Sequence, residues 1–141
     1  MRDLNFPLEE RLYNLYQERK VFASAHFLIS RGGEILQLVP LKFQAWHAGP
    51  STFKGIRSCN RFMVGIENIG KSGEPFTPFQ YQANAKLCLW LMYTYGFDVS
   101  WITGHMDVAI PKGRKKDPGK DFRWDHLRKL IFEAGRAAVE Q

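Results

Sequence analysis

The chain has 141 residues, a length that fits one domain spanning 1–141. With 45% hydrophobic and 14% aromatic residues it can bury a core, which excludes a wholly disordered chain. No apolar run approaches the roughly 20 residues of a membrane span, and the net charge of +6 indicates an anionic partner without saying which.

The first part of the chain predicts a helix followed by a β-hairpin. In Pro7–Lys20, apolar residues recur at helical spacing, and two glutamates lie near the end that a helix dipole makes positive. Two β-like runs, Ala23–Ser30 and Glu34–Val39, are joined by the glycine-rich turn 31–33. The first residues lack the apolar core of a signal peptide, so we expect synthesis in the cytoplasm without a secretion signal.

The middle of the chain predicts a long loop and one more strand. Pro40–Asn60 contains glycines and prolines that interrupt any period, and a loop of that length inside a compact domain is usually functional. Phe62–Ile69 is the next strand candidate. Gly65 in its interior indicates close approach by another backbone or by a ligand.

The best-defined predicted helix is Pro78–Tyr95. Thr77 is its N-cap, Gln80 completes a capping box, and Gly96 ends it. Apolar residues lie almost all round this helix, so we expect it to be largely buried.

Two further elements complete the expected fold. Val99–Thr103 predicts a short strand, and Trp124–Val139 predicts an amphipathic helix. The order of elements predicts an α/β fold with a small mixed central β-sheet flanked by helices. Cys59 and Cys88 make no metal pair by spacing, and we expect Cys88 to be a buried small hydrophobe.

His105 and Asp117 are the first candidates for chemistry. His105 directly follows the short predicted strand, and Asp117 lies on a loop rich in glycine, proline and lysine. An imidazole and a carboxylate from two such segments can meet at one zinc ion and leave a position open for water. The alternative is a surface histidine and an aspartate that belongs to an ordinary β-turn.

Four more residues have a functional and a structural interpretation. Glu67 sits in an apolar strand, where burial would make it a general base; the alternative is an outward-facing glutamate. Lys115 could stabilise an oxyanion, or it could belong to a solvated basic loop. His47 has small neighbours that leave room for a ligand, and Trp46 could offer a flat face to a sugar or peptide. Equally, one buried tryptophan could simply anchor that loop.

Together these residues resemble the amidase-2 type N-acetylmuramoyl-L-alanine amidases, which include phage endolysins, muropeptide-recycling amidases and peptidoglycan recognition proteins. The resemblance covers about residues 23–124 and rests on six segments in the family's order at compatible spacing. These are S-A-H-F-L-I-S-R-G-G-E-I-L-Q-L-V-P at 24–40, A-W-H-A-G at 45–49, C-N-R-F-M-V-G-I-E at 59–67, F-T-P-F-Q-Y at 76–81, T-G-H at 103–105 and G-R-K-K-D-P-G at 113–119.

The resemblance implies a zinc enzyme. His105 matches the family's second zinc ligand, and Asp117 matches the third. Glu67 matches the acidic residue that activates the zinc-bound water, and Lys115 matches the lysine that supports the tetrahedral intermediate.

The resemblance also implies a binding groove and a fold. Trp46 and His47 match one wall of the substrate groove, and Asn60, in the third segment, is a further substrate-binding candidate. The implied fold is that of the peptidoglycan-recognition-protein-like amidases, as a monomer.

The chain departs from the family's pattern at its start. The first zinc ligand of the family is a histidine on an upstream strand, whereas no histidine precedes His26 here. A truncated start without that strand, a third ligand from elsewhere and an incomplete site all stay open. Strand alternation puts Ala25 at the active-site position and turns His26 away, and the loop of His47 is not the ligand position, so neither is assigned. Ser58 replaces an arginine of recycling-type relatives, which leaves the preferred stem peptide open.

Three functions follow from these patterns. The leading hypothesis is zinc-dependent hydrolysis of the amide bond between N-acetylmuramic acid and L-alanine in peptidoglycan or muropeptides. The positive charge favours polymeric wall and a phage or prophage lysin. The alternative is a non-catalytic peptidoglycan-binding domain with an incomplete zinc site. The third is a basic nucleic-acid-binding domain, but no DNA- or RNA-binding pattern accompanies the charge, so we expect neither nucleic acid nor membrane as partner.

Overall fold

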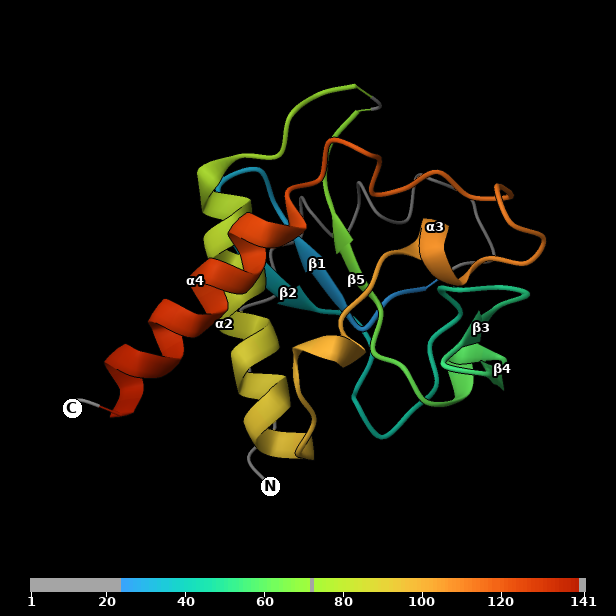
Figure 1. Ribbon diagram of the computed structural model, residues 1–141, viewed down its shortest axis with the longest axis horizontal. Helices are drawn as coiled ribbons and strands as arrows, with labels where there is room; N and C mark the ends of the chain where they lie inside the picture. The colour runs from blue at the N-terminus through green and yellow to red at the C-terminus, as the bar shows by residue number, and fades with distance from the viewer. Residues whose placement is uncertain (1–23, 72, 140–141) are drawn as a thin grey trace.

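The computed structural model describes residues 24–71 and 73–139, which form a small sheet with helices packed against it (Figure 1). The predicted helix Pro7–Lys20 lies outside the described residues. In chain order the elements are β1 (Phe27–Ile29), β2 (Ile35–Gln37), β3 (Thr52–Phe53), β4 (Ile56–Arg57), the 3-10 turn η1 (Cys59–Arg61), β5 (Ile66–Asn68), α2 (Pro78–Tyr95), the 3-10 turn η2 (Val99–Trp101), α3 (His105–Val108) and α4 (Trp124–Val139).

Strand β1 is the centre of a three-stranded sheet with the order β2-β1-β5. β2 pairs with it antiparallel, with Leu36 opposite Leu28, and β5 pairs with it parallel, with Glu67 opposite Leu28. The β1–β2 turn needs a glycine, because Gly33 has φ 84° and a Cβ there would lie 2.8 Å from the Phe79 carbonyl oxygen. The predicted hairpin and the mixed α/β sheet are confirmed.

Both faces of β1 are covered. Phe27 and Ile29 pack against α2, in one buried cluster with Ala83, Leu87 and Leu91. Leu28 packs with Leu36 on the opposite face of the sheet. This explains why β1 reads as a continuous apolar run and not as an alternating one.

Helix α2 has the predicted bounds. The Thr77 hydroxyl accepts a hydrogen bond from Gln80 N at 3.1 Å, and the Gln80 side chain accepts one from Thr77 N at 3.0 Å. Gly96 ends the helix in the left-handed conformation with φ 71°. Each of the three capping residues therefore has its predicted role.

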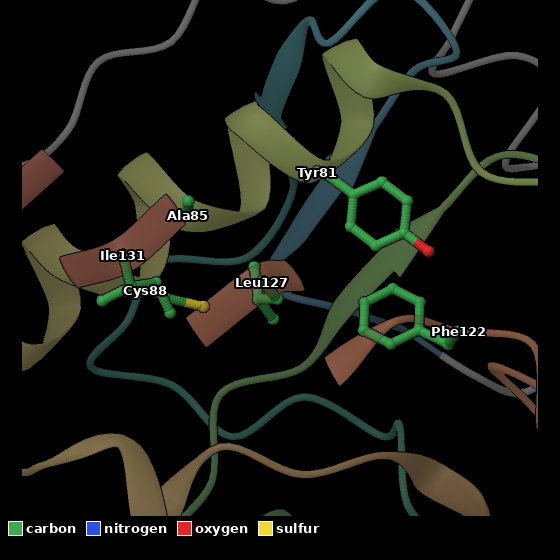
Figure 2. Close-up of a cluster of buried hydrophobic side chains, with 6 residues drawn as sticks. All are labelled: Tyr81, Ala85, Cys88, Phe122, Leu127 and Ile131. Atoms are coloured by element: carbon green, nitrogen blue, oxygen red, sulfur yellow. The ribbon is translucent and has the colours of Figure 1, made fainter. Parts of the chain in front are cut away.

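Helix α4 crosses α2 and closes the main hydrophobic core (Figures 1 and 2). Cys88 is one of its buried residues, a free thiol whose pKa burial raises to about 12, as expected for a small hydrophobe. None of the described helices combines the length and apolar character that crossing a bilayer needs. The buried members of this core, drawn in Figure 2, are Tyr81, Ala85, Cys88, Phe122, Leu127 and Ile131.

The predicted strand Val99–Thr103 is wrong. Its first three residues form the 3-10 turn η2, because the Asp98 carboxylate accepts a hydrogen bond from Ser100 N at 2.8 Å. The amide of Trp101 then donates to Asp98 O at 3.1 Å. Local hydrogen bonds of this kind compete with strand pairing.

The predicted long loop holds a small hairpin, and the strand after it is shorter than expected. Within 40–60, β3 and β4 pair around Lys54 and Gly55, whose φ values of 50° and 79° suit a tight hairpin turn. The strand predicted at Phe62–Ile69 is confined to β5. Its beginning is used by the turn η1, in which Phe62 N donates to Cys59 O at 3.2 Å.

Candidate active site

A cleft of about 1180 Å³ opens between loop 40–60, β5 and the segment from residue 102 to 119. One of the predicted site residues, Trp46, is not among the residues that line it, and its side chain is 63% exposed on the loop. The six predicted site residues that do line the cleft are His47, Asn60, Glu67, His105, Lys115 and Asp117.

His105 and Asp117 are in direct contact. His105 is the first residue of α3, and its Nδ1 lies 3.1 Å from Asp117 Oδ2. Their backbones are tied as well, because Met106 N donates to Asp117 O at 2.8 Å. Gly104 allows this approach, since a Cβ there would lie 2.7 Å from Pro118 Cδ.

The second ring nitrogen of His105 is also occupied. Nε2 donates to the Ala48 carbonyl oxygen at 3.0 Å, so in a neutral ring Nδ1 carries the lone pair and faces the Asp117 carboxylate. Two acceptors at this distance need a proton or a cation between them. Accordingly, the hydrogen bond with Asp117 raises the pKa of His105 above its ordinary value, and the same hydrogen bond lowers the pKa of Asp117.

This geometry fits two ligands of a zinc ion. Atoms bound at about 2.0–2.1 Å to one tetrahedral zinc lie roughly 3.3 Å apart, close to the 3.1 Å between His105 Nδ1 and Asp117 Oδ2. The bond from His105 Nε2 to a backbone carbonyl is the usual outer support of a zinc-bound histidine. Among the described residues, no third histidine, cysteine or carboxylate completes the group, and residues 1–23 contain no histidine or cysteine.

His26 and His47 form hydrogen bonds with backbone atoms of segments that line the cleft. His26 Nδ1 accepts from Gly65 N at 3.1 Å, and its Nε2 donates to Phe43 O at 2.8 Å, which occupies both ring nitrogens. His47 Nε2 donates to Met63 O at 3.0 Å. Gly65 has a close neighbour, but it is the His47 side chain and not the predicted backbone or ligand, because a Cβ at Gly65 would lie 2.5 Å from His47 Cγ.

Glu67 and Lys115 reach the cleft from different sides. Glu67 is half-buried in β5, at the position that pairs with Leu28 of β1. Lys115 is exposed, two residues before Asp117 on the same loop. Both residues line the cleft that holds the His105–Asp117 contact, and their roles there stay predictions.

The Asn60 side chain and the Trp46 backbone each form hydrogen bonds that hold loop 40–60 in place. Asn60 Oδ1 accepts from His47 N at 3.0 Å and from Ala48 N at 2.8 Å. The Trp46 backbone is joined to Ser24, whose Oγ accepts from Trp46 N at 2.8 Å. Contact with substrate stays a prediction for both residues.

Arg114 has a role that sequence reasoning missed. Its guanidinium donates to the carbonyl oxygens of Ala48 and Pro50, both at 2.9 Å, and to that of Ile110 at 2.8 Å. In the sequence it is one of four basic residues in 112–116, a run that by composition alone indicates solvated charge. Only its place within the segment G-R-K-K-D-P-G sets it apart.

Comparison with known proteins gives a consistent result. Residues 5–120 match the Amidase_2 family, described as N-acetylmuramoyl-L-alanine amidase. The chain is 43% identical over 108 residues to the 1,6-anhydro-N-acetylmuramyl-L-alanine amidase AmpD of Salmonella typhimurium (strain SL1344), a match that covers 77% of this chain and 57% of that protein. It is 38% identical over 102 residues to the N-acetylmuramoyl-L-alanine amidase AmiD of Escherichia coli (strain K12), covering 66% of this chain and 36% of that protein. The chain thus spans little more than half the length of the first of these relatives.

Two solved structures share the fold. A crystal structure of a selenomethionine derivative of AmpD superposes with a TM-score of 0.74 at 37% identity, covering 88% of this chain and 69% of that one. A complex of AmiD from E. coli with the substrate anhydro-N-acetylmuramic acid-L-Ala-D-gamma-Glu-L-Lys superposes with a TM-score of 0.72 at 26% identity, covering 92% of this chain and 60% of that one.

Proposed function

The chain belongs to the Amidase_2 family, and from this premise we propose that it hydrolyses the amide bond between N-acetylmuramic acid and L-alanine. The observation that carries the proposal is the contact of His105 Nδ1 with Asp117 Oδ2, 3.1 Å apart at the cleft. A lone pair aimed at a carboxylate suits a bound cation, and the wide cleft beside it has room for a substrate.

Zinc is the cation that we propose. Bound to His105 and Asp117, zinc would polarise the scissile carbonyl and lower the pKa of a bound water from 15.7 toward about 7. A catalytic zinc site has three protein ligands and one open position. The described residues supply two of these ligands, so the ligand set proposed here is incomplete.

Glu67 is the proposed general base. Its carboxylate is half-buried in β5 and lines the cleft. From there it can take a proton from the attacking water and return that proton to the leaving nitrogen of L-alanine.

Lys115 and loop 40–60 complete the proposed machinery. The Lys115 ammonium, on the loop that carries Asp117, would stabilise the negative oxygen of the tetrahedral intermediate. The exposed indole of Trp46 offers a flat face to the sugar or the peptide stem, and His47 and Asn60 line the cleft beside it.

The proposed substrate is a soluble muropeptide. AmpD is named for its action on 1,6-anhydro-N-acetylmuramyl-L-alanine, and the AmiD complex holds an anhydro-muramyl peptide. Polymeric peptidoglycan is the other substrate, which the net charge of +6 favours because the wall carries negative charge.

One observation favours a second candidate function, a peptidoglycan-binding domain without catalysis. Among the described residues, the metal site has two side-chain ligands and lacks a third. A site of this kind would bind zinc weakly, while the cleft would still accept a muropeptide.

The test is a cleavage assay with two substrates. The purified chain, with zinc added, is incubated with an anhydro-muramyl tripeptide and, in parallel, with insoluble peptidoglycan. Mass spectrometry then follows the release of peptide with a free L-alanine amino group. Release from the muropeptide supports the proposal. A muropeptide that is bound but uncut, in a protein that elemental analysis finds free of zinc, supports the binding domain instead.

A further inference from the structure

Arg114 joins the two segments that carry the site. Its Nη2 donates to Ala48 O and Pro50 O at 2.9 Å each, and its Nε donates to Ile110 O at 2.8 Å. Ala48 and Pro50 belong to loop 40–60, whereas Ile110 lies two residues after the end of α3. One planar guanidinium thus adds three side-chain hydrogen bonds to the backbone bond from Ile110 N to Pro50 O, which already joins the loop to the segment after α3.

The Ala48 carbonyl receives two donors. Arg114 Nη2 lies 2.9 Å from this oxygen, and His105 Nε2 lies 3.0 Å from it. A carbonyl oxygen has two lone pairs, so this pair of donors uses both. The amide on the other side of Ala48 is held too, because its N–H donates to Asn60 Oδ1 at 2.8 Å.

Gly49 makes room for this arrangement. It has φ 60°, and a Cβ there would lie 3.1 Å from Arg114 Nη2. A side chain at this position would be strained and would press on the guanidinium. The local backbone is therefore shaped to let Arg114 reach the carbonyl that His105 also uses.

We infer that Arg114 is a positioning residue for His105, acting through the Ala48 carbonyl that both side chains share. This inference rests on the proposed function, since the aim of His105 Nδ1 matters if it holds a cation with Asp117. When Nε2–H is fixed on Ala48 O, the lone pair of Nδ1 points to Asp117. Without Arg114, the Ala48 carbonyl loses one of its two donors, and loop 48–50 is tied to Ile110 only through the backbone, by the bond from Ile110 N to Pro50 O at 2.9 Å. The imidazole is then held less firmly at Ala48 O.

The test compares three variants that separate charge from geometry. Arg114→Ala removes the charge and the three hydrogen bonds. Arg114→Lys keeps the charge but lacks the planar fork from which Nε and Nη2 reach separate carbonyls. Lys116→Ala removes a charge from an exposed position on the same loop and is the matched control.

Two readouts follow the His105 ring and its affinity for a cation. The first is the pair of ring nitrogen chemical shifts of His105 in metal-free protein at about pH 9, where a neutral ring is favoured, assigned with His105→Ala. The second is the dissociation constant for zinc. In Arg114→Ala we expect the shifts to depart from the parent values and zinc affinity to fall about 10–100-fold. Lys116→Ala should match the parent chain, and Arg114→Lys should lie between them.

The inference is overturned if Arg114→Ala keeps both the parent nitrogen shifts and the parent zinc affinity, or if Lys116→Ala loses as much affinity as Arg114→Ala. If Arg114→Ala does not fold, Arg114→Lys decides by the same two measurements, and parent values in that variant overturn the inference. A parent chain that binds no zinc contradicts the proposed function instead. The nitrogen shifts of metal-free protein still decide the role of Arg114 in that case.

Discussion

The layer formed by α2 and α4 and the loops of the cleft are held together in different ways. Between the helices, the contacts are apolar and repeat along each helix, as in the cluster of Figure 2. Around the cleft, the apolar cluster of Ala48, Cys59 and Val108 is small, and polar atoms join further segments that are far apart in the chain. Ala48 and His105 are 57 residues apart, and Ala48 and Arg114 are 66 apart. We expect the helix layer to supply most of the stability, and the cleft loops to supply the chemistry.

His105→Ala should separate the two regions most clearly. It removes a proposed zinc ligand, so we expect zinc to be lost and cleavage to fall at least about 10³-fold. The free energy of unfolding should change by about 1–3 kcal/mol, because the residue is half-buried and contributes two hydrogen bonds, to Ala48 O and to Asp117 Oδ2. Assays of cleavage, bound zinc and urea unfolding check this. His126→Ala, in α4, is the control and should cleave normally; equal losses in both variants would contradict the division.

Glu67→Gln should give the next largest effect. It keeps the size of the side chain and removes the proposed base, so turnover should fall about 10²–10⁴-fold. Zinc binding should be retained, since Glu67 is not a proposed ligand. Steady-state kinetics and elemental analysis measure the two quantities. Normal turnover in this variant would show that the base lies elsewhere.

Leu127→Ala should show the opposite pattern. Leu127 is 3% exposed in the core between α2 and α4, and its truncation should lower the free energy of unfolding by about 2–5 kcal/mol. The activity of each folded molecule should stay within about threefold of the parent. Phe132→Ala, on the same helix but 65% exposed, is the control and should change stability by about 0.5 kcal/mol or less. A selective loss of turnover in Leu127→Ala would show that the helix layer also contributes to catalysis, which would contradict the division.

The helix layer was the more predictable region, and α2 shows why. Its capping residues Thr77 and Gln80 lie three positions apart and bond to one another, so the signal is complete within one turn of sequence. The strand predicted at Val99–Thr103 was wrong, and local hydrogen bonds again explain the outcome. An apolar run there suggested pairing, but Asp98 bonds locally to Ser100 and turns the chain.

The sequence predicted which residues line the cleft, but not how their side chains are arranged. The matching motifs brought out His105, Asp117, Glu67 and Lys115, all of which line the cleft. They did not predict that Arg114, among its basic neighbours, would turn inward. That choice depends on carbonyls more than 60 residues earlier in the chain, whose positions no local pattern encodes.

The stability of the whole fold should depend on pH through two histidines that lie beside the cleft, His26 and His47. Burial lowers the pKa of His26, and it lowers that of His47 to about 4, whereas an unfolded chain has values near 6.5. As pH falls below about 6.5, the unfolded chain binds protons that the folded chain does not, so stability is present above that pH and declines toward pH 4. For His47 the loss between pH 7.5 and 5 is about 2 kcal/mol.

Urea unfolding at several pH values measures this loss, with His47→Gln as the comparison. The variant cannot titrate at this position, so its stability should decline less steeply over the same range. The two rings lie 5.9 Å apart, and charging one disfavours charging the other. Parallel curves for the parent and the variant would show that His47 does not contribute.

Thr77→Ala should give the smallest of these effects and should sharpen the account of the helix layer. The Thr77 hydroxyl accepts from Gln80 N at 3.1 Å and donates to the Arg31 carbonyl at 2.6 Å, so it caps α2 and ties it to the β1–β2 turn. We expect a loss of about 1–2 kcal/mol in the free energy of unfolding. Thr94→Ala is the matched control, because its hydroxyl only donates back to Trp90 O within the last turn of the same helix. Equal losses from the two threonines would mean that helix propensity, and not the cap, is what Thr77 provides.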